Sequence, residues 1–211
     1  LCEDGFTHNE QSVRNVELLE KDGKGLNLTW EVRDGMLNHQ TGLMPSTMEG
    51  KIVRLSDKIA YINHDIDDAI RRKVLSEEGI PAEYREILGS TTRQRLNTLI
   101  HNIITNSLGK NDICMSEEVE QAMKSLRKFM FQNVYQNPVA KGEEERAKDL
   151  LSRLFYYYNK NIDCLPKLYL RMLEEGEKRD RVVCDYIAGM TDRYAIAKFE
   201  EFFMPKACQV N

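Results

Sequence analysis

Several side chains that could hold a metal ion or a ligand fall on one face of a single predicted helix. At about 100° per residue, Asp57, Tyr61, His64 and Asp68 lie within roughly 60° of one another, with Asp65 beside them. A carboxylate in such a row can bind a divalent cation, and a tyrosine ring can pack against a bound ligand. The same pattern is also typical of a solvated helix face, because charged outer faces are the rule in globular proteins. Two interpretations therefore stay open, a pocket wall and an ordinary exposed face.

The neighbouring residues His64 and Asp65 resemble a metal-binding histidine–aspartate pair. A divalent ion needs further nitrogen and oxygen ligands that converge in three dimensions. The remaining histidines are His8, His39 and His101, and the sequence holds no second histidine–aspartate pair. We therefore do not assign a metal site to this pair.

The helix that would present these residues is the clearest one in the sequence, from about residue 48 to residue 75. Its apolar residues recur three and four positions apart, the spacing of a helix with one buried face. They are Ile52, Leu55, Ile59, Ile62, Ile66 and Ile70. Ser46 or Thr47 can cap its first turn. The apolar face predicts a core on the side opposite to Asp57 and Tyr61.

Helical spacing dominates the rest of the chain, and no segment alternates as a strand does. We predict further helices over 9–20, 28–38, 91–108, 116–136, 143–160 and 165–176, and two between 178 and 204 that are broken around 189–192. The connection 76–89 should contain a turn of helix at most. The predicted fold class is all-α, in one unit or in two lobes hinged near residues 109–115 or 138–143.

Composition narrows the class of protein further. Of 211 residues, 41% are hydrophobic and 30% charged, and the formal charge of −4 gives no overall attraction to nucleic acid or to an anionic membrane. No apolar run approaches the roughly 18 residues of a membrane span. The scattered cysteines, odd in number and without a C-x-x-C pair, argue against a disulfide framework or a zinc site and fit a reducing, cytoplasmic location. They are Cys2, Cys114, Cys164, Cys184 and Cys208.

Four ordered segments carry a resemblance to a known family. Residues 56–70 read SDKIAYINHDIDDAI, 5–12 read GFTHNEQS, 28–39 read LTWEVRDGMLNH, and 181–195 read RVVCDYIAGMTDRYA. Each is similar to a segment of the bacterial HD-domain deoxynucleoside triphosphate triphosphohydrolases, also called dGTPase-like enzymes. The first resembles the helix that follows the HD metal motif in that family. Residues 76–140 add nothing to the resemblance.

The resemblance implies an all-α, multi-helix HD-domain-like dNTPase, of which this chain is the C-terminal part, with the upstream HD-motif helices missing. Residues 1–75 would belong to the HD-type catalytic core and include its final metal aspartate. Residues 76–211 would form a helical region that completes the nucleotide pocket and makes oligomer contacts. The family hydrolyses a dNTP to the deoxynucleoside and inorganic triphosphate, so the full-length protein is expected to be an enzyme. The 211 residues alone are expected to be inactive.

The resemblance also assigns roles to five residues. Asp57 corresponds to the last of four metal ligands, and the first three would precede Leu1. Lys58 corresponds to a lysine that contacts the triphosphate, where an ammonium neutralises phosphate charge. Tyr61 and Asp65 correspond to positions that meet the deoxyribose, the ring over the sugar and the carboxylate at its 3′-hydroxyl. His8 corresponds to a histidine near the scissile phosphate, where it could protonate the departing 5′-oxygen as the catalytic acid.

Plainer interpretations of the same residues remain. Lys58 would then be a surface lysine, Asp65 an exposed helix carboxylate, and His8 a histidine that caps or packs at a helix start. At the level of the protein, the alternative is a non-catalytic helical module for regulation or oligomerisation.

Cofactor and partners follow from the resemblance as well. They are a divalent metal ion (Mg²⁺ or Mn²⁺, or alternatively iron or another transition metal), a dNTP substrate with dGTP favoured, a homo-oligomer, and a dNTP as allosteric ligand. No membrane partner is expected, and nucleic acid is not indicated.

Overall fold

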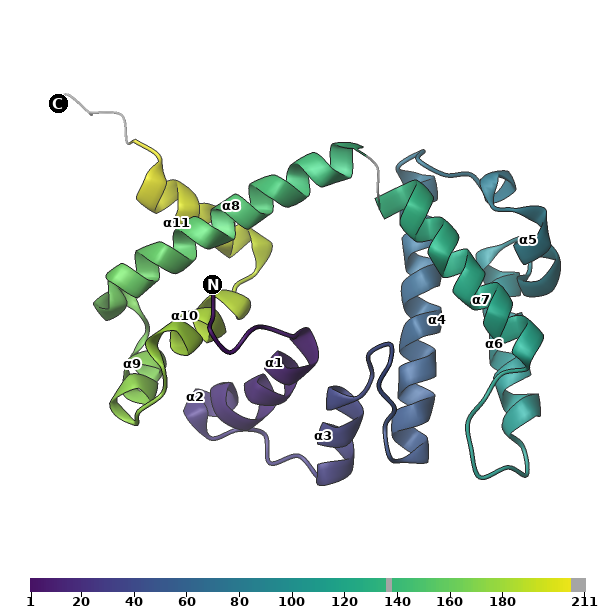
Figure 1. The fold of residues 1–211 in the computed structure, drawn as a ribbon, viewed down its shortest axis with the longest axis horizontal. Helices are drawn as coiled ribbons and strands as arrows, with labels where there is room; N and C mark the ends of the chain where they lie inside the picture. Colours follow the sequence, from purple (N-terminus) through teal and green to yellow (C-terminus); the bar gives the residue numbers. More distant parts are fainter. Residues whose placement is uncertain (136–137, 206–211) are drawn as a thin grey trace. The chain divides into compact units, whose positions relative to one another are not determined.

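The computed structural model describes residues 1–135 and 138–205, and the side chains in these ranges apart from those of 138–141. Within them the chain is all-α, without a strand, as the sequence predicts (Figure 1). The predictions at Gln136 and Cys208 lie outside the described residues. Among the described residues, no helix combines the length and the apolar character that crossing a membrane requires.

The chain forms two compact units, which are described separately. The first unit contains residues 1–28 and 142–211, and the second contains residues 29–141. The boundary at 141/142 falls in one of the two predicted hinge regions, whereas the boundary at 28/29 was not predicted. A functional division at residue 75 does not coincide with either boundary, and it stays a prediction.

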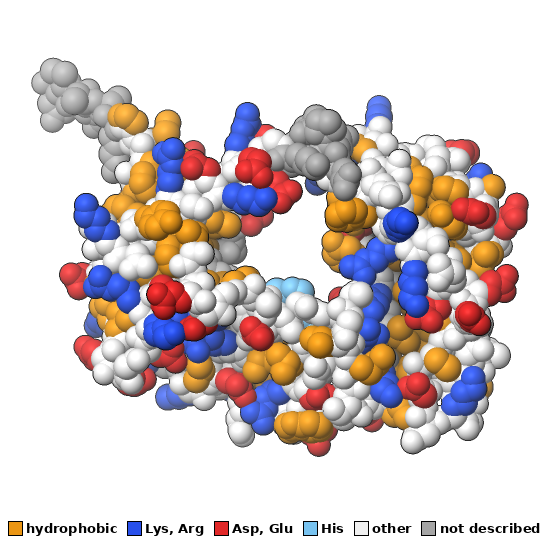
Figure 2. All heavy atoms as spheres, in the orientation of Figure 1, with side chains coloured by type: hydrophobic (Ala, Val, Ile, Leu, Met, Phe, Trp, Pro, Cys, Tyr) orange, Lys and Arg blue, Asp and Glu red, His pale blue; other side chains and the backbone are white. Residues whose placement is uncertain are grey.

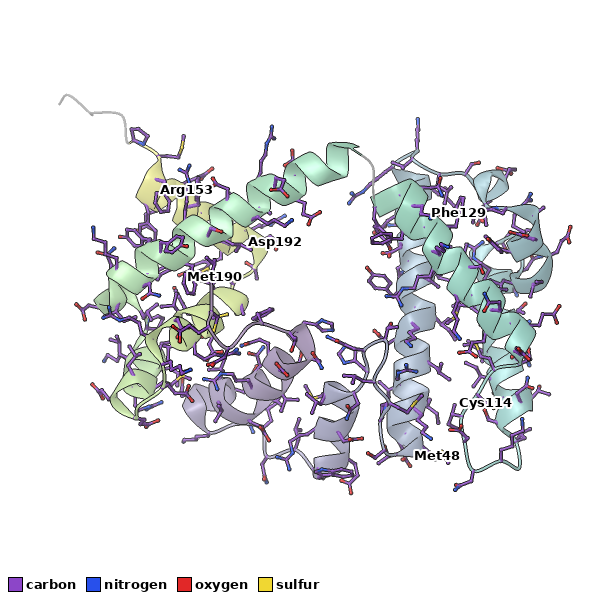
Figure 3. The ribbon with its side chains drawn as sticks, in the orientation of Figure 1. Met48, Cys114, Phe129, Arg153, Met190 and Asp192 are labelled. Atoms are coloured by element: carbon purple, nitrogen blue, oxygen red, sulfur yellow. The ribbon has the colours of Figure 1, made fainter. Side chains whose placement is uncertain are left out.

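The second unit is a bundle around one long helix. Its helices are α3 (Trp30–Leu37), α4 (Met48–Arg71), α5 (Ala82–Leu88), α6 (Thr92–Ser107) and α7 (Glu117–Met130), which continues as a π-helical turn over Phe131–Tyr135. Met48 marks the start of α4 in Figure 3. The buried residues of α4 and those of α6 and α7 form one hydrophobic core. Its members include Ile59, Ile62, Ile66, Leu99, Leu126 and Met130.

Local sequence determines where α4 starts and how closely it approaches α3. The Thr47 side chain caps the helix by accepting a hydrogen bond from the Gly50 amide at 3.0 Å. Gly50 also lies against α3, where a β-carbon would come within 3.5 Å of the Gly35 α-carbon and 2.7 Å of Pro45 Cβ. Two glycines therefore let the backbones of α3 and α4 approach each other closely.

Three predictions for the second unit need correction. Ile52, expected in the core, is 49% exposed, because the core residues of α4 begin only further along the helix. The helix ends at Arg71 instead of residue 75, since Lys73 takes a left-handed backbone conformation with φ of 57°. The connection 76–89 holds the seven-residue helix α5, whose Leu88 is fully buried, so tertiary packing stabilises more helix than the local sequence suggests.

The first unit joins the start of the described chain to its last four helices. It contains α1 (His8–Arg14), a π-helical turn (Asn15–Leu19), the short α2 (Glu20–Gly23), α9 (Lys167–Glu174), α10 (Arg179–Ala188) and α11 (Asp192–Phe203). It also contains α8 (Pro138–Lys160) from residue 142 onward. The helix predicted over 9–20 corresponds to α1 and the π-helical turn that continues it to Leu19. Lys21 and Asp22, which have positive φ, interrupt the short α2 that follows.

Aromatic packing dominates the core of the first unit. Tyr157 of α8 stacks on Phe202 of α11 with ring centroids 4.0 Å apart. Arg153 of α8 lies over the Phe199 ring of α11 at 5.8 Å, where the two helices are adjacent (Figure 3). The predicted break before α11 is confirmed, and Thr191 caps that helix by accepting from the Tyr194 amide.

Candidate functional site

One side of α4 carries four of the five residues selected from the sequence. Asp57 and Tyr61 are exposed, and Tyr61 has 54% of its surface accessible to solvent. Lys58 and Asp65 are half-buried. The opposite side of the helix supplies buried isoleucines to the core. The helical spacing of the sequence therefore brings Asp57, Lys58, Tyr61 and Asp65 together on a surface that the core leaves open.

Lys58 lies in a cluster of positive charge. Burial lowers the pKa of its ammonium group, and the charges of Arg54 and Arg127 lower it further. Lys124 acts in the same direction, while Glu120 opposes the shift. Figure 2 shows lysine and arginine side chains gathered along α4 and the adjoining α7. Because like charges repel, these cations, Arg54, Lys58, Lys124 and Arg127, form a surface that a polyanion would stabilise. We call them the basic cluster.

The loop between α3 and α4 holds two guanidinium groups of the basic cluster. Arg54 Nε donates to the carbonyl oxygen of Gln40 at 3.4 Å, and Arg127 Nη1 donates to Thr41 Oγ1 at 2.8 Å. Adjacent loop residues thus contact a side chain from α4 and another from α7. The loop restrains both arginines beside Lys58.

Tyr61 and Asp65 interact one turn beyond Lys58. Burial raises the pKa of the Tyr61 phenol, and the charge of Asp65 and a hydrogen bond to it raise it further. Burial also raises the pKa of the Asp65 carboxyl, followed by the charge of Asp68, while the hydrogen bond from Tyr61 opposes the shift. Asp65 Oδ2 is buried and has no hydrogen-bond partner among the described residues. An unsatisfied buried carboxylate oxygen costs stability.

Asp57 offers one of the ligands that a metal site would need. An exposed carboxylate has the oxygen donor that Mg²⁺ or Mn²⁺ prefers. Within residues 1–135 and 138–205, however, no three histidine, cysteine or acidic side chains are grouped so that they could hold a metal ion. The described residues therefore fit one ligand position and not a complete site, and we derive no reaction step through a metal.

His8 belongs to the first unit, whereas Asp57, Lys58, Tyr61 and Asp65 belong to the second. It is the first residue of α1 and is exposed. The Ser12 hydroxyl donates to the His8 carbonyl at 2.8 Å within the same helix. Its imidazole thus lies at the start of a short helix, and the position of that helix sets the position of the imidazole.

Two side chains on α1 contact α10 in the first unit. Gln11 Nε2 donates to Asp185 Oδ1 at 3.0 Å, and Arg14 Nε donates to both oxygens of that carboxylate, at 2.7 and 2.9 Å. Asp185 is fully buried. The contacts join the segment around His8 to the segment 181–195, two of the four segments selected from the sequence.

Sequence reasoning missed several of these residues. Arg54 could have been found from the sequence, because it lies four residues before Lys58 and therefore on the same face of α4. Arg127 could not have been found in this way, since its proximity to Lys58 depends on how α7 packs against α4. The partnership of Gln11 and Arg14 with Asp185 spans more than 170 residues and was equally out of reach.

Comparison with known proteins supports the resemblance found in the sequence. Residues 113–201 match the family model of the phosphohydrolase-associated domain. A deoxyguanosinetriphosphate triphosphohydrolase-like protein of Caldanaerobacter subterraneus subsp. tengcongensis is 54% identical over 205 residues, which cover 97% of this chain and 60% of the relative. Proteins of the same name from Clostridium perfringens and Geobacter sulfurreducens are 44% and 30% identical, over 96% and 95% of this chain and 61% and 65% of the relatives.

The chain spans about three fifths of the length of the first two of these relatives. The identity extends over nearly all of its residues and includes both units. Over nearly all of its residues this chain is similar to deoxyguanosinetriphosphate triphosphohydrolase-like proteins, and residues 113–201 match the phosphohydrolase-associated domain.

Proposed function

We propose that the full-length protein hydrolyses a dNTP, with dGTP as the favoured substrate, to the deoxynucleoside and inorganic triphosphate. The observation that carries the proposal is the basic cluster on α4 and α7, with the Tyr61–Asp65 pair one turn along the same helix. A surface with several cations at one end and an aromatic ring and a carboxylate at the other is complementary to a nucleotide. The names of the relatives supply the substrate.

The basic cluster would bind the phosphates. Its guanidinium and ammonium groups can donate several charge-assisted hydrogen bonds to phosphate oxygens. Burial, followed by the charges of Arg54 and Arg127, lowers the pKa of Lys58, and a bound polyanion would offset the repulsion among these cations. Arg54 and Arg127 are restrained by the loop before α4, so less side-chain entropy is lost when they bind.

The Tyr61–Asp65 pair would bind the deoxyribose. A sugar 3′-hydroxyl could donate a hydrogen bond to the half-buried Asp65 carboxylate. The Tyr61 ring is 54% exposed and could cover the sugar at C2′, which would favour a sugar that lacks a 2′-hydroxyl. The preference for dNTP over NTP would then rest on steric exclusion by Tyr61.

Asp57 and His8 complete the proposal. Asp57 would be one ligand of a divalent ion, which supplies Lewis-acid activation when bound. His8 would donate the proton that the departing 5′-oxygen needs, because an imidazolium can serve as a general acid. A homo-oligomer, an allosteric dNTP and a cytoplasmic location belong to the same proposal.

The test is a product analysis with the full-length protein, dGTP, and Mg²⁺ or Mn²⁺. Deoxyguanosine and inorganic triphosphate should appear in equal amounts. Lys58→Ala should raise the KM for dGTP by about tenfold or more, the scale of one lost hydrogen bond to a charged group. Lys51→Ala is the matched control on the same helix, since Lys51 is already paired with Asp112 at 2.8 Å. That variant should retain the KM of the wild type.

Other outcomes would contradict the proposal. Pyrophosphate and dGMP as products would mean that the bond between the α-phosphorus and the oxygen bridging to the β-phosphate breaks, instead of the bond to the 5′-oxygen. A full-length protein that binds dGTP without hydrolysing it would support the alternative, a helical regulatory module.

A further inference from the structure

A buried carboxylate on α10 holds the helix that begins with His8. Asp185 is 0% exposed and accepts hydrogen bonds from Gln11 and Arg14, which follow His8 on α1. Arg181, one turn before Asp185, donates to Gln11 Oε1 and to Asp185 Oδ1, the latter at 3.3 Å. Gln11 therefore contacts the network through both atoms of its amide.

The chain before His8 is attached to the same helix. The Glu3 amide donates to Asp180 Oδ2 at 2.9 Å, and Lys178 Nζ, at the start of α10, donates to Asp4 Oδ1 at 2.9 Å. Contacts with the α10 region thus lie on both sides of His8. They restrain the chain on either side of His8.

The charges in this network restrict α1 to one position. Asp185 faces two guanidinium groups, and Arg14 also pairs with Glu177 at 2.9 Å, so each buried charge has an opposite charge beside it. A displacement of α1 would leave Asp185 buried without its partners, which costs several kcal/mol for an unpaired buried charge. Because hydrogen bonds depend on distance and angle, a shift of α1 would weaken several of these bonds at once.

We propose that Asp185 is a positioning residue for His8. The proposal rests on the proposed function, in which His8 protonates the leaving oxygen. Gln11 lies three residues after His8, so about 4.5 Å of rigid helix connects the contact with Asp185 to the imidazole-bearing residue. A displacement of about 1 Å at a catalytic group can lower the rate by about 100-fold. Asp185 itself touches no substrate in this scheme.

The experiment uses Gln11→Met in the full-length protein. Methionine fills the volume of Gln11 but removes its bonds to Asp185 and Arg181, while the ion pair between Arg14 and Asp185 stays in place. We expect kcat for dGTP to fall about 10- to 100-fold, with KM changed less than about twofold. Asp163→Asn, an exposed acidic residue of the same unit, is the control and should leave both constants unchanged.

A double-mutant cycle separates positioning from simple stabilisation. In a His8→Ala background, Gln11→Met should cause no further loss of kcat, because its effect passes through His8. A further loss as large as in the wild-type background would overturn the proposal. Asp185→Asn should follow the same rule if it folds, and Gln11→Met keeps the test valid if it does not.

A spectroscopic readout distinguishes this proposal from the proposed function. The imidazole signals of His8, identified by their loss in His8→Ala, are followed by NMR in ¹³C-histidine-labelled full-length protein. Gln11→Met should shift or broaden them, and unchanged His8 signals would overturn the positioning role. If the wild type hydrolyses no dNTP but the His8 signals still respond to Gln11→Met, the proposed function fails and the structural link to His8 stands.

Discussion

Arg95 Nε of α6 donates a hydrogen bond of 3.1 Å to Asn63 Oδ1 of α4. Although Arg95 is only 1% exposed, its guanidinium also pairs with Glu77 at 2.8 Å. Asn63 uses its amide nitrogen as well, donating to the Ile59 carbonyl at 2.8 Å. A buried cation thus ties α6 and the turn before α5 to the core side of the helix that bears the candidate site.

Removal of this cation should destabilise the second unit. Arg95→Met leaves Asn63 Oδ1 and Glu77 without their donor, and we expect a loss of about 3 kcal/mol in the free energy of unfolding, the low end for a broken buried ion pair. The low end applies because the Glu77 side chain is 28% exposed. Urea unfolding measures the loss. The control, Arg71→Met, breaks an exposed pair with Asp68 and should cost at most about 1 kcal/mol; equal losses in both variants would contradict this account.

Asp65 should cost the protein stability at neutral pH. Burial, followed by the charge of Asp68, raises its pKa in the folded state above the ordinary value of 3.8. A carboxyl with a raised folded pKa binds its proton more tightly when folded, so stability falls as the pH rises through that pKa. Asp65→Asn should therefore unfold at a higher temperature than the wild type at pH 7, and the difference should shrink towards pH 3.

The control for Asp65 is Asp112, whose pKa is shifted in the opposite direction. A hydrogen bond from Lys51 lowers the pKa of Asp112, so this residue contributes stability above the ordinary pKa and loses it as the pH falls. Asp112→Asn should thus unfold at a slightly lower temperature at pH 7. If both variants shift in the same direction at pH 7, the environment of Asp65 differs from the one described.

Tyr61 should select against ribonucleotides. Tyr61→Ala in the full-length protein would open space at C2′, so the ratio of kcat/KM for dGTP to that for GTP should fall, together with weaker binding of both. Asp65→Asn should mainly weaken binding through the 3′-hydroxyl and leave the ratio nearly unchanged. Steady-state kinetics with both substrates measures this, and an unaltered ratio in Tyr61→Ala would make Tyr61 an ordinary surface residue.

His8 should act on the rate of the chemical step. His8→Ala should lower kcat by about 10²- to 10⁴-fold, the usual scale for a lost general acid, with a much smaller change in KM. His101→Ala, which removes an exposed histidine of α6, is the matched control and should behave as the wild type. A normal kcat with a raised KM in His8→Ala would instead identify His8 as a binding residue.

A protein limited to residues 1–211 should not hydrolyse dNTPs. Its described residues offer Asp57 but no group of three metal-binding side chains, and one carboxylate cannot hold a catalytic ion alone. Triphosphate release with added Mg²⁺ or Mn²⁺ is the measurement. Robust turnover by these 211 residues would show that the metal ligands have been misplaced.

The sequence predicts what depends on one helix and fails where two distant segments meet. The face of α4 with Asp57, Tyr61 and Asp65 follows from a period of 3.6 residues, so it could be identified from spacing alone. The position of Arg127 beside Lys58 depends on the packing of α7, and no local pattern encodes it. Ile52 illustrates the reverse error, since helical spacing marks it as apolar and inward although nothing described covers it.

Helix ends were harder to predict than helix faces. The helix α4 ends at Arg71 because Lys73 has a left-handed backbone conformation. Glycine and asparagine are the usual residues in that conformation, so a lysine gave no sign of it in the sequence. The helix α5 depends on the burial of Leu88 in the core and has little support from its own sequence. Both cases reflect tertiary context overriding local preference.

The bond between Arg14 and Asp185 has a consequence for biosynthesis. The two residues are 171 positions apart, and the residues of the second unit all lie between them. A ribosome adds about 5–20 residues per second, so α1 waits roughly ten to thirty seconds before its partner is made. The second unit is one continuous segment and can fold during that interval. Until then Gln11 and Arg14 of α1 lack their partner Asp185, so the packing of the first unit can be completed only after the second unit has been made.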